Sequence, residues 1–147
     1  VRSYYAPARQ MNLVMSGNDY ARARELATWR RKIDANWPRV RLRRLDEVST
    51  EIRAGETLVL SVAAKLEGLA PDEVLVECLV GTVSEVGKFI TLDAHVFEAG
   101  NRLDSGETLF TLKMIPRLSG LQYYKIRMFP FHPALAHRYE AGYLLWL

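Results

Sequence analysis

The sequence predicts a mainly β protein with an α-helical N-terminus: two helices followed by a seven-stranded antiparallel β-sandwich of the immunoglobulin or fibronectin-III type. Three observations support this fold class. The spacing of apolar residues changes from three-to-four to two at Pro38. Seven short strand-like runs follow, separated by turn residues and with no helical run among them. Hydrophobic residues make up 49% of the 147 residues, which is enough to fill one packed core.

The first helix is expected over residues 1–16, where large apolar side chains recur every three or four positions and share one face. Pro7 fits a helix only near its first turn. Gly17 is expected to end this helix, and Asn18 or Asp19 to cap the next one. An apolar face of this kind is a candidate for contact with a neighbouring domain or for self-association. Its candidate contact residues are Tyr4, Tyr5, Met11 and Met15.

The second helix is expected from Tyr20 to about Asn36. It carries an apolar seam that must be buried against another element, and one sheet of the sandwich is the expected partner. The seam consists of Leu26, Trp29, Ile33 and Trp37. Pro38 ends the helix, because the residue before a proline avoids the α region. We therefore divide the chain into a helical segment, residues 1–38, and a C-terminal β domain, residues 39–147.

The strands are predicted by alternation of apolar and polar residues after Pro38. In the first run, Val40 and Leu42 alternate with arginines. The other six runs are Thr57–Leu66, Glu73–Val80, Phe89–Phe97, Glu107–Ile115, Leu121–Phe129 and Tyr143–Leu147. The run Glu73–Val80 is apolar on both of its faces, which predicts a central strand that is covered on both sides.

The charge is uneven along the chain. Residues 1–50 hold eleven Lys or Arg against five Asp or Glu, and residues 51–147 hold nine against twelve, so a net +6 is followed by a net −3. We interpret the basic side chains as a solvated face, because no nucleic-acid motif accompanies them. No stretch approaches the ~18 apolar residues of a membrane span. Nucleic acid and membrane are therefore not expected as partners.

The residue types that carry chemistry are sparse. His132 and His137 lie five apart with Glu140 nearby, but this is not the spacing of a known metal motif, and a local turn hydrogen bond is the favoured interpretation of His132. His95, beside Asp93, is interpreted as a surface residue. No Gly-rich phosphate loop occurs. The single cysteine, Cys78, is expected to be a buried, inert thiol, which favours a cytoplasmic location.

Three aromatic residues near the C-terminus are candidates for contact with a ligand. Flat apolar rings pack against the C–H faces of sugars, and Tyr123, Phe129 and Phe131 could act in this way. The alternative is that the same rings fill the core of the sandwich or dock on another domain. The sequence favours this second interpretation and leaves the first open.

Two stretches resemble a known family. The C-terminal one has the order Tyr-x-x-Arg-x-x-Pro-x-His-Pro-x-Leu, then Glu-x-Gly-x-x-x-Trp. It consists of Tyr124, Arg127, Pro130, His132, Pro133, Leu135, Glu140, Gly142 and Trp146. The N-terminal one comprises Tyr4–Ala8, Leu26–Ile33 and Trp37-Pro38. Together they resemble the C-terminal region of bacterial α-glucan (glycogen or maltodextrin) phosphorylases of the long type.

The resemblance implies a parent glycosyltransferase that uses pyridoxal phosphate and inorganic phosphate to release glucose 1-phosphate from α-1,4-glucans. The cofactor lysine of that family lies in a segment rich in Gly, Ser, Asn and Met, and no segment here matches it. We therefore assign no catalytic, cofactor-binding or metal residue and expect an inactive fragment, which the absence of a starting Met also fits. Its expected partners are the catalytic domains of the parent chain. The alternative is a stand-alone β-sandwich module that binds glucan or a protein partner.

Overall fold

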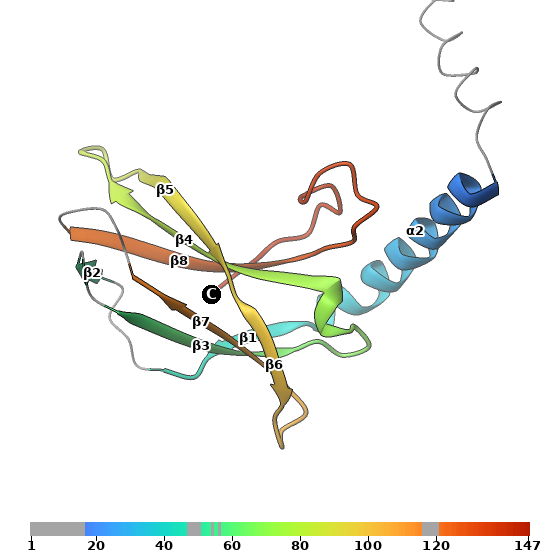
Figure 1. Ribbon diagram of the computed structural model, residues 1–147, viewed down its shortest axis with the longest axis horizontal. Helices are drawn as coiled ribbons and strands as arrows, with labels where there is room; N and C mark the ends of the chain where they lie inside the picture. Colours follow the sequence, from blue (N-terminus) through green and yellow to red (C-terminus); the bar gives the residue numbers. More distant parts are fainter. Residues whose placement is uncertain (1–16, 47–50, 54, 56, 116–120) are drawn as a thin grey trace, which may run out of the picture.

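The computed structural model describes residues 17–46, 51–53, 55, 57–115 and 121–147. Two antiparallel β-sheets face each other, and one long helix, α2, leads away from them at one end (Figure 1). The expected first helix, with Tyr4, Tyr5, Met11 and Met15, lies outside the described residues. No helix in the described part of the chain is long and apolar enough to cross a membrane.

Helix α2 (Gly17–Asn36) confirms the expected second helix but begins earlier. Gly17 is its first described residue, so Asn18 and Asp19, the expected caps, lie inside the helix. The expected apolar seam is confirmed: Trp29 and Ile33 are buried, Leu26 packs against the core, and Trp37 is buried in the short 3₁₀ helix η1 (Trp37–Arg39) that follows.

The four-stranded sheet has the order β1-β3-β7-β6, and all of its pairs are antiparallel. Its strands are β1 (Arg41–Arg44), β3 (Leu58–Lys65), β7 (Thr108–Met114) and β6 (Glu98–Arg102). The five-stranded sheet has the order β2-β8-β4-β5, with β9 also paired to β8. Its strands are β2 (Glu51–Arg53), β8 (Leu121–Pro130), β4 (Val74–Val83), β5 (Phe89–Val96) and β9 (Leu145–Trp146).

The described residues form nine strands, not the expected seven. All seven expected runs are strands, but β2 and β6 occupy stretches that look like turns in the sequence. Strand β6 forms because the chain passes from one sheet to the other at Phe97, whose N–H donates to the carbonyl of Val76 over 2.8 Å. Phe97 is buried at this crossing, so tertiary packing and not local propensity extends the strand.

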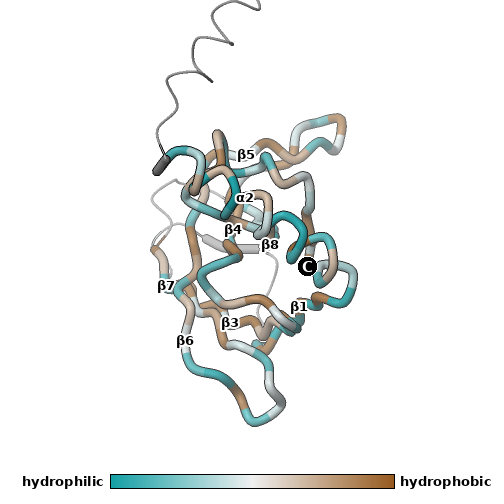
Figure 2. Tube along the Cα trace, turned by 90° about the vertical axis from the view of Figure 1, so that its right-hand side faces the viewer, coloured by the Kyte–Doolittle hydropathy of each residue, from teal (hydrophilic) through white to brown (hydrophobic). Residues whose placement is uncertain are grey.

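The core lies between the two sheets. Alternate residues of β3 point inward, and Leu60 and Val62 are fully buried, as is Met128 of β8. Strand β4 is covered on both faces, as expected: Cys78 faces the core, and Glu77, on the opposite face, is also 0% exposed. Figure 2 shows hydrophobic residues along β3 and β4, whereas many residues of α2 are hydrophilic.

Candidate functional site

The chain between β8 and β9, residues 131–144, is here called the C-terminal segment. It contains most of the motif that carries the family resemblance. It begins where Phe131 N–H donates to the carbonyl of Glu73 over 2.8 Å. From there it runs over the outer face of the five-stranded sheet and beside α2 (Figure 1). The polar residues of the motif hold this segment in place.

A buried carboxylate on β4 is the main anchor of the C-terminal segment. Glu77 is fully buried and lies opposite Arg127 in the register of β4 and β8. Arg127 Nε donates to Glu77 Oε1 over 2.5 Å, and Arg138 Nη1 lies 3.5 Å from Glu77 Oε2. The hydroxyl of Tyr139 accepts from Arg127 over 2.5 Å. These four residues form what we call the Glu77 cluster, which joins the segment to the middle of the sheet.

Aromatic rings enclose the same cluster. The Arg127 guanidinium lies 4.8 Å from the ring centroid of Tyr139 and 5.6 Å from that of Trp146. Contacts of this type stabilise a cation when it is removed from water. Every charge of the cluster has a partner within the chain, so the cluster joins the C-terminal segment and β9 to the sheet.

A separate polar contact, centred on Arg44 and Tyr124, joins the two sheets to each other. Arg44, at the end of β1, donates to the hydroxyl of Tyr124 on β8 and pairs with Asp46 over 2.8 Å. Asp46 in turn accepts from the N–H of Ser61 on β3 over 2.6 Å. Burial raises the pKa of Tyr124, although the hydrogen bond from Arg44 opposes this. The motif tyrosine therefore ties the sheets together as a neutral hydroxyl.

The turn at His132 is also structural. His132 Nδ1 accepts from the N–H of Ala134 over 3.0 Å, which confirms the expected local turn hydrogen bond. Glu140 caps the neighbouring turn by accepting from Ala136 N–H over 2.9 Å, and it lies 3.4 Å from Arg30 of α2. Across the described residues no group of three or more His, Cys, Asp or Glu could hold a metal ion.

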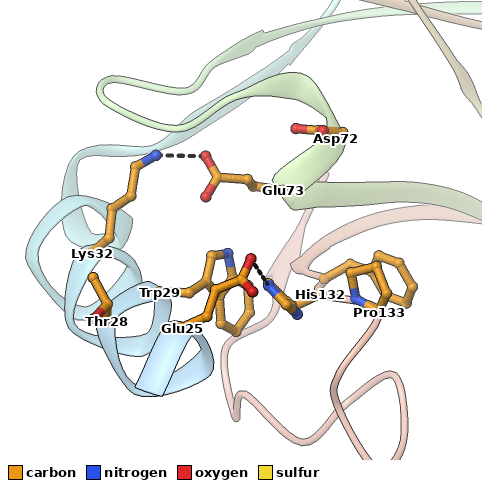
Figure 3. Close-up of a pocket in the computed structure, with 9 residues that line it drawn as sticks. Glu25, Thr28, Trp29, Lys32, Asp72, Glu73, His132 and Pro133 are labelled. Carbon is orange, nitrogen blue, oxygen red and sulfur yellow. Dashed lines mark hydrogen bonds and ion pairs between the residues drawn. The ribbon is translucent and has the colours of Figure 1, made fainter. Parts of the chain in front are cut away.

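One groove lined by residues of the C-terminal segment is a candidate binding site, and we call it the α2–η2 groove (Figure 3). It lies between α2, the 3₁₀ helix η2 (Pro71–Glu73) and the turn at His132, and its volume is about 610 Å³. The groove is lined by Glu25, Thr28, Trp29, Lys32, Asp72, Glu73, Phe131, His132 and Pro133.

On one wall of the groove, the charges of Lys32 and Glu73 compensate each other in an ion pair. Lys32 Nζ donates to Glu73 Oε1 over 2.7 Å, and the same oxygen accepts from the N–H of Ala70 over 2.7 Å. Partial burial acts to raise the pKa of Glu73, but these two donors outweigh it, so the pKa is lowered and the carboxylate stays charged. The opposite wall has Glu25 Oε1 3.8 Å from His132 Nε2.

The floor of the groove carries an unsatisfied donor. Trp29 is 5% exposed, its ring lies 5.2 Å from that of His132, and its indole Nε1 has no hydrogen-bond partner among the described residues. Figure 3 shows this nitrogen at the edge of the ring nearest Glu73. A buried N–H without an acceptor is rare in native structures. It indicates a position where an acceptor atom from outside the chain would be stabilised.

The predicted aromatic candidates have different environments. Phe129 is 1% exposed and packs 5.0 Å from the ring of Tyr139, so it cannot offer its ring to a ligand. Tyr123 and Phe131 are half-buried. Phe131 lines the α2–η2 groove, and Tyr123 lines a separate hollow of about 510 Å³ on the five-stranded sheet. The structure does not bring Tyr123 and Phe131 into one site.

Sequence reasoning missed most of the groove. Glu25, Thr28 and Lys32 follow one another at helical spacing around Trp29, so their common face could have been identified. Asp72 and Glu73 lie far along the chain in an expected turn. No local pattern places them opposite α2.

Comparison with known proteins gives consistent matches over the chain. The family described as "Glycogen phosphorylase C-terminal domain" matches residues 37–147. The chain is 32% identical over 146 residues to a protein of Mycobacterium tuberculosis strain H37Rv named glycogen phosphorylase, covering 97% of this chain. It is 24% identical over 155 residues to a Thermococcus litoralis protein named maltodextrin phosphorylase, covering 99% of this chain. The chain spans about 17% of the length of each relative.

Proposed function

This chain belongs to the glycogen phosphorylase C-terminal domain family, and on that premise we propose that it is the non-catalytic C-terminal domain of a longer α-glucan phosphorylase. That longer protein would be a glycosyltransferase releasing glucose 1-phosphate from α-1,4-glucans with inorganic phosphate. The observation that carries the proposal is the use of the motif residues. Four residues of the motif make contacts inside the chain. Arg127 pairs with the buried Glu77, and Glu140 lies against Arg30 of α2. Tyr124 joins the two sheets, and His132 accepts within its own turn.

Two buried groups with the chemistry of a nucleophile or a base, Cys78 and Glu77, are held in unreactive environments. Burial raises the pKa of the Cys78 thiol to about 12, so the reactive thiolate does not form near neutral pH. Glu77 is enclosed by two guanidinium groups. These environments support a structural role for the domain.

Pyridoxal phosphate is the cofactor implied for the longer protein, and the two lysines that line the α2–η2 groove and the hollow at Tyr123, Lys32 and Lys125, do not fit it. The cofactor needs a free lysine amine near groups that bind a phosphate. Lys32 is paired with Glu73, and the other charged groups of its groove, Glu25 and Asp72, would repel a phosphate. Lys125 lies over the ring of Phe89 on an outer sheet face, 4.7 Å from its centroid. We therefore propose that cofactor and catalysis belong to the remaining length of the longer protein.

Two assays test this proposal. The 147-residue chain is incubated with maltodextrin and inorganic phosphate, and glucose 1-phosphate is measured. Pyridoxal phosphate is added separately, and the absorbance spectrum is inspected for a new band. We expect neither signal from this chain and both from the longer protein that contains it. Phosphorolysis by the chain alone would contradict the proposal, as would a longer protein without this activity.

Three finer assignments are part of the same proposal. The two facing antiparallel sheets support a sandwich of the immunoglobulin or fibronectin-III type. The free thiol of Cys78 supports a cytoplasmic location, which cell fractionation would test.

The partners would be the catalytic domains of the longer protein, with self-association through residues 1–16 when the chain is alone. Sedimentation of the chain and of a Tyr4→Ser, Tyr5→Ser variant would show whether that surface forms dimers.

A further inference from the structure

We propose that the α2–η2 groove docks a basic peptide segment of the longer protein, with a main-chain carbonyl of that segment accepting from the Trp29 indole N–H. Lysine or arginine side chains of the segment would pair with Glu25 and Asp72 at the rim of the groove. This inference rests on the proposed function and names the surface through which the domain contacts the rest of its polypeptide. The three elements around the groove, α2, η2 and the turn at His132, come from distant parts of the sequence.

The unsatisfied indole nitrogen is the first argument. An indole N–H can only donate, so only an acceptor atom satisfies it. Trp29 is 5% exposed and lines the groove, and its Nε1 has no acceptor among the described residues. Figure 3 shows this nitrogen at the edge of the ring nearest Glu73. Every residue of a peptide presents a carbonyl oxygen, which would satisfy the donor whatever the side chain.

The uncompensated charge of the rim is the second argument. Lys32 and Glu73 compensate each other over 2.7 Å. Two further carboxylates line the groove. Glu25 lies 3.8 Å from His132 Nε2, and Asp72 forms no ion pair within the part of the chain that the structure describes. One lysine thus faces three carboxylates, and this excess of negative charge attracts cationic side chains.

The apolar part of the lining also suits a basic side chain. Phe131 and Pro133 line the groove, and the ring of Phe131 is half-buried. The aliphatic stems of Lys and Arg pack on such surfaces while their charged ends reach carboxylates nearby. A basic segment can therefore use the apolar and the acidic side chains of the groove together.

Other ligand classes satisfy only one of these features. The three carboxylates repel phosphates and other anions. A polyamine would compensate the charge but has no acceptor for the indole N–H. A neutral ligand could satisfy the indole but would leave Glu25 and Asp72 without a cation. A peptide with basic side chains supplies both the acceptor and the cations.

The rest of the longer protein is the source of the segment in this proposal. The chain spans about 17% of the length of its relatives, so under the proposed function most of the polypeptide precedes α2. Helix α2 contributes to the groove and leads away from the sheets (Figure 1). A segment of the same polypeptide has a high effective concentration at a site on α2, which favours it over a separate partner.

The test compares hydrogen–deuterium exchange in the longer protein and in the 147-residue chain, measured by mass spectrometry. A docked segment covers η2 and the turn at His132, so the local opening that permits exchange becomes less frequent there. We expect exchange in these two elements to be slower by at least about tenfold in the longer protein, the effect of one or two hydrogen bonds to charged groups.

Two variants of the longer protein test the chemistry of docking. Glu25→Gln combined with Asp72→Asn removes the rim charges, and Trp29→Phe removes the donor but keeps an aromatic ring. Each should return exchange at η2 and at the His132 turn to the rate of the 147-residue chain. The matched control is Asp104→Asn, which removes an exposed carboxylate outside the groove and should change nothing. The same substitutions in the 147-residue chain give the baseline, and circular dichroism confirms that each variant is folded.

Each outcome supports or overturns the proposal. Equal exchange of the groove in the two proteins overturns it. Slower exchange that survives either substitution also overturns it, because another kind of contact would then cover the groove. Exchange that slows as the concentration of the 147-residue chain is raised assigns the groove to a second copy and overturns it as well. The proposed function is tested separately, because it depends on glucose 1-phosphate release by the longer protein and not on exchange at the groove.

Discussion

Removal of Arg127 tests the structural role of the Glu77 cluster most directly. Glu77 is fully buried, and Arg127, with its side chain 16% exposed, is its nearest cation. Arg127→Met keeps much of the side-chain volume but leaves the buried carboxylate without this partner. Breaking a buried ion pair on one side costs about 3–5 kcal/mol. Because Arg138 still lies 3.5 Å from Glu77 and is 42% exposed, we expect the lower end, about 3 kcal/mol.

Urea unfolding followed by tryptophan fluorescence measures this cost. With a slope of about 2 kcal/mol per molar urea, a loss of about 3 kcal/mol lowers the midpoint by about 1.5 M. The double variant Glu77→Gln with Arg127→Met removes both charges and should recover much of the stability. The matched control is Arg43→Met, which breaks an exposed pair with Glu107 and should change the midpoint far less. If Arg127→Met cost less than about 1 kcal/mol, the Glu77 cluster would not anchor the C-terminal segment.

Three further predictions concern single buried positions. Trp29→Ala should cost about 3–5 kcal/mol in urea unfolding, because it empties the contact between α2 and the domain; a cost below about 1 kcal/mol would show that α2 is not packed there. The Cys78 thiol has its pKa raised by burial from 9.0 to about 12, so the group contributes stability at pH below 9 that is lost as pH rises toward 12, and a thiol reagent at pH 8 should label it only after unfolding; fast labelling of the native chain would contradict its burial. Gly81→Ala should destabilise the chain by about 2–3 kcal/mol, because the new Cβ would lie 1.9 Å from the carbonyl oxygen of Ile90 across the β4–β5 bulge; an unchanged thermal midpoint would refute this contact.

The local elements of the fold could be predicted because their signals are local. The seam Leu26, Trp29, Ile33 has helical spacing, and alternate burial along Leu58–Lys65 has the period of a strand, so each pattern identifies its element and its buried face. Strands β2 and β6 could not be predicted in this way. Their residues resemble turns, and they are extended only because a neighbouring strand supplies hydrogen-bond partners.

The candidate site could be predicted only in part. Phe131 was a candidate from its aromatic ring, and His132 was correctly expected to make a turn hydrogen bond. The sequence left open whether Phe129 is buried or available to a ligand. A strand that ends in aromatic residues does not show which of its rings another segment covers. Glu77 gave no signal at all, since an isolated glutamate in an apolar run has no visible partner until Arg127 is placed opposite it.

By itself, the sequence determined the helix before Pro38 and its buried seam, the seven main strands, the double burial of β4 and the family resemblance, because all of these depend on spacing along the chain. Only the tertiary structure shows that Glu77 is neutralised by Arg127. Only the tertiary structure places Asp72 and Glu73 opposite α2, across a groove that contains the unpartnered indole N–H of Trp29. The physical reason is that hydrogen bonds and ion pairs depend on separations of about 3 Å in space. Residues distant in the chain reach such separations only when the sheets have paired and the C-terminal segment has docked.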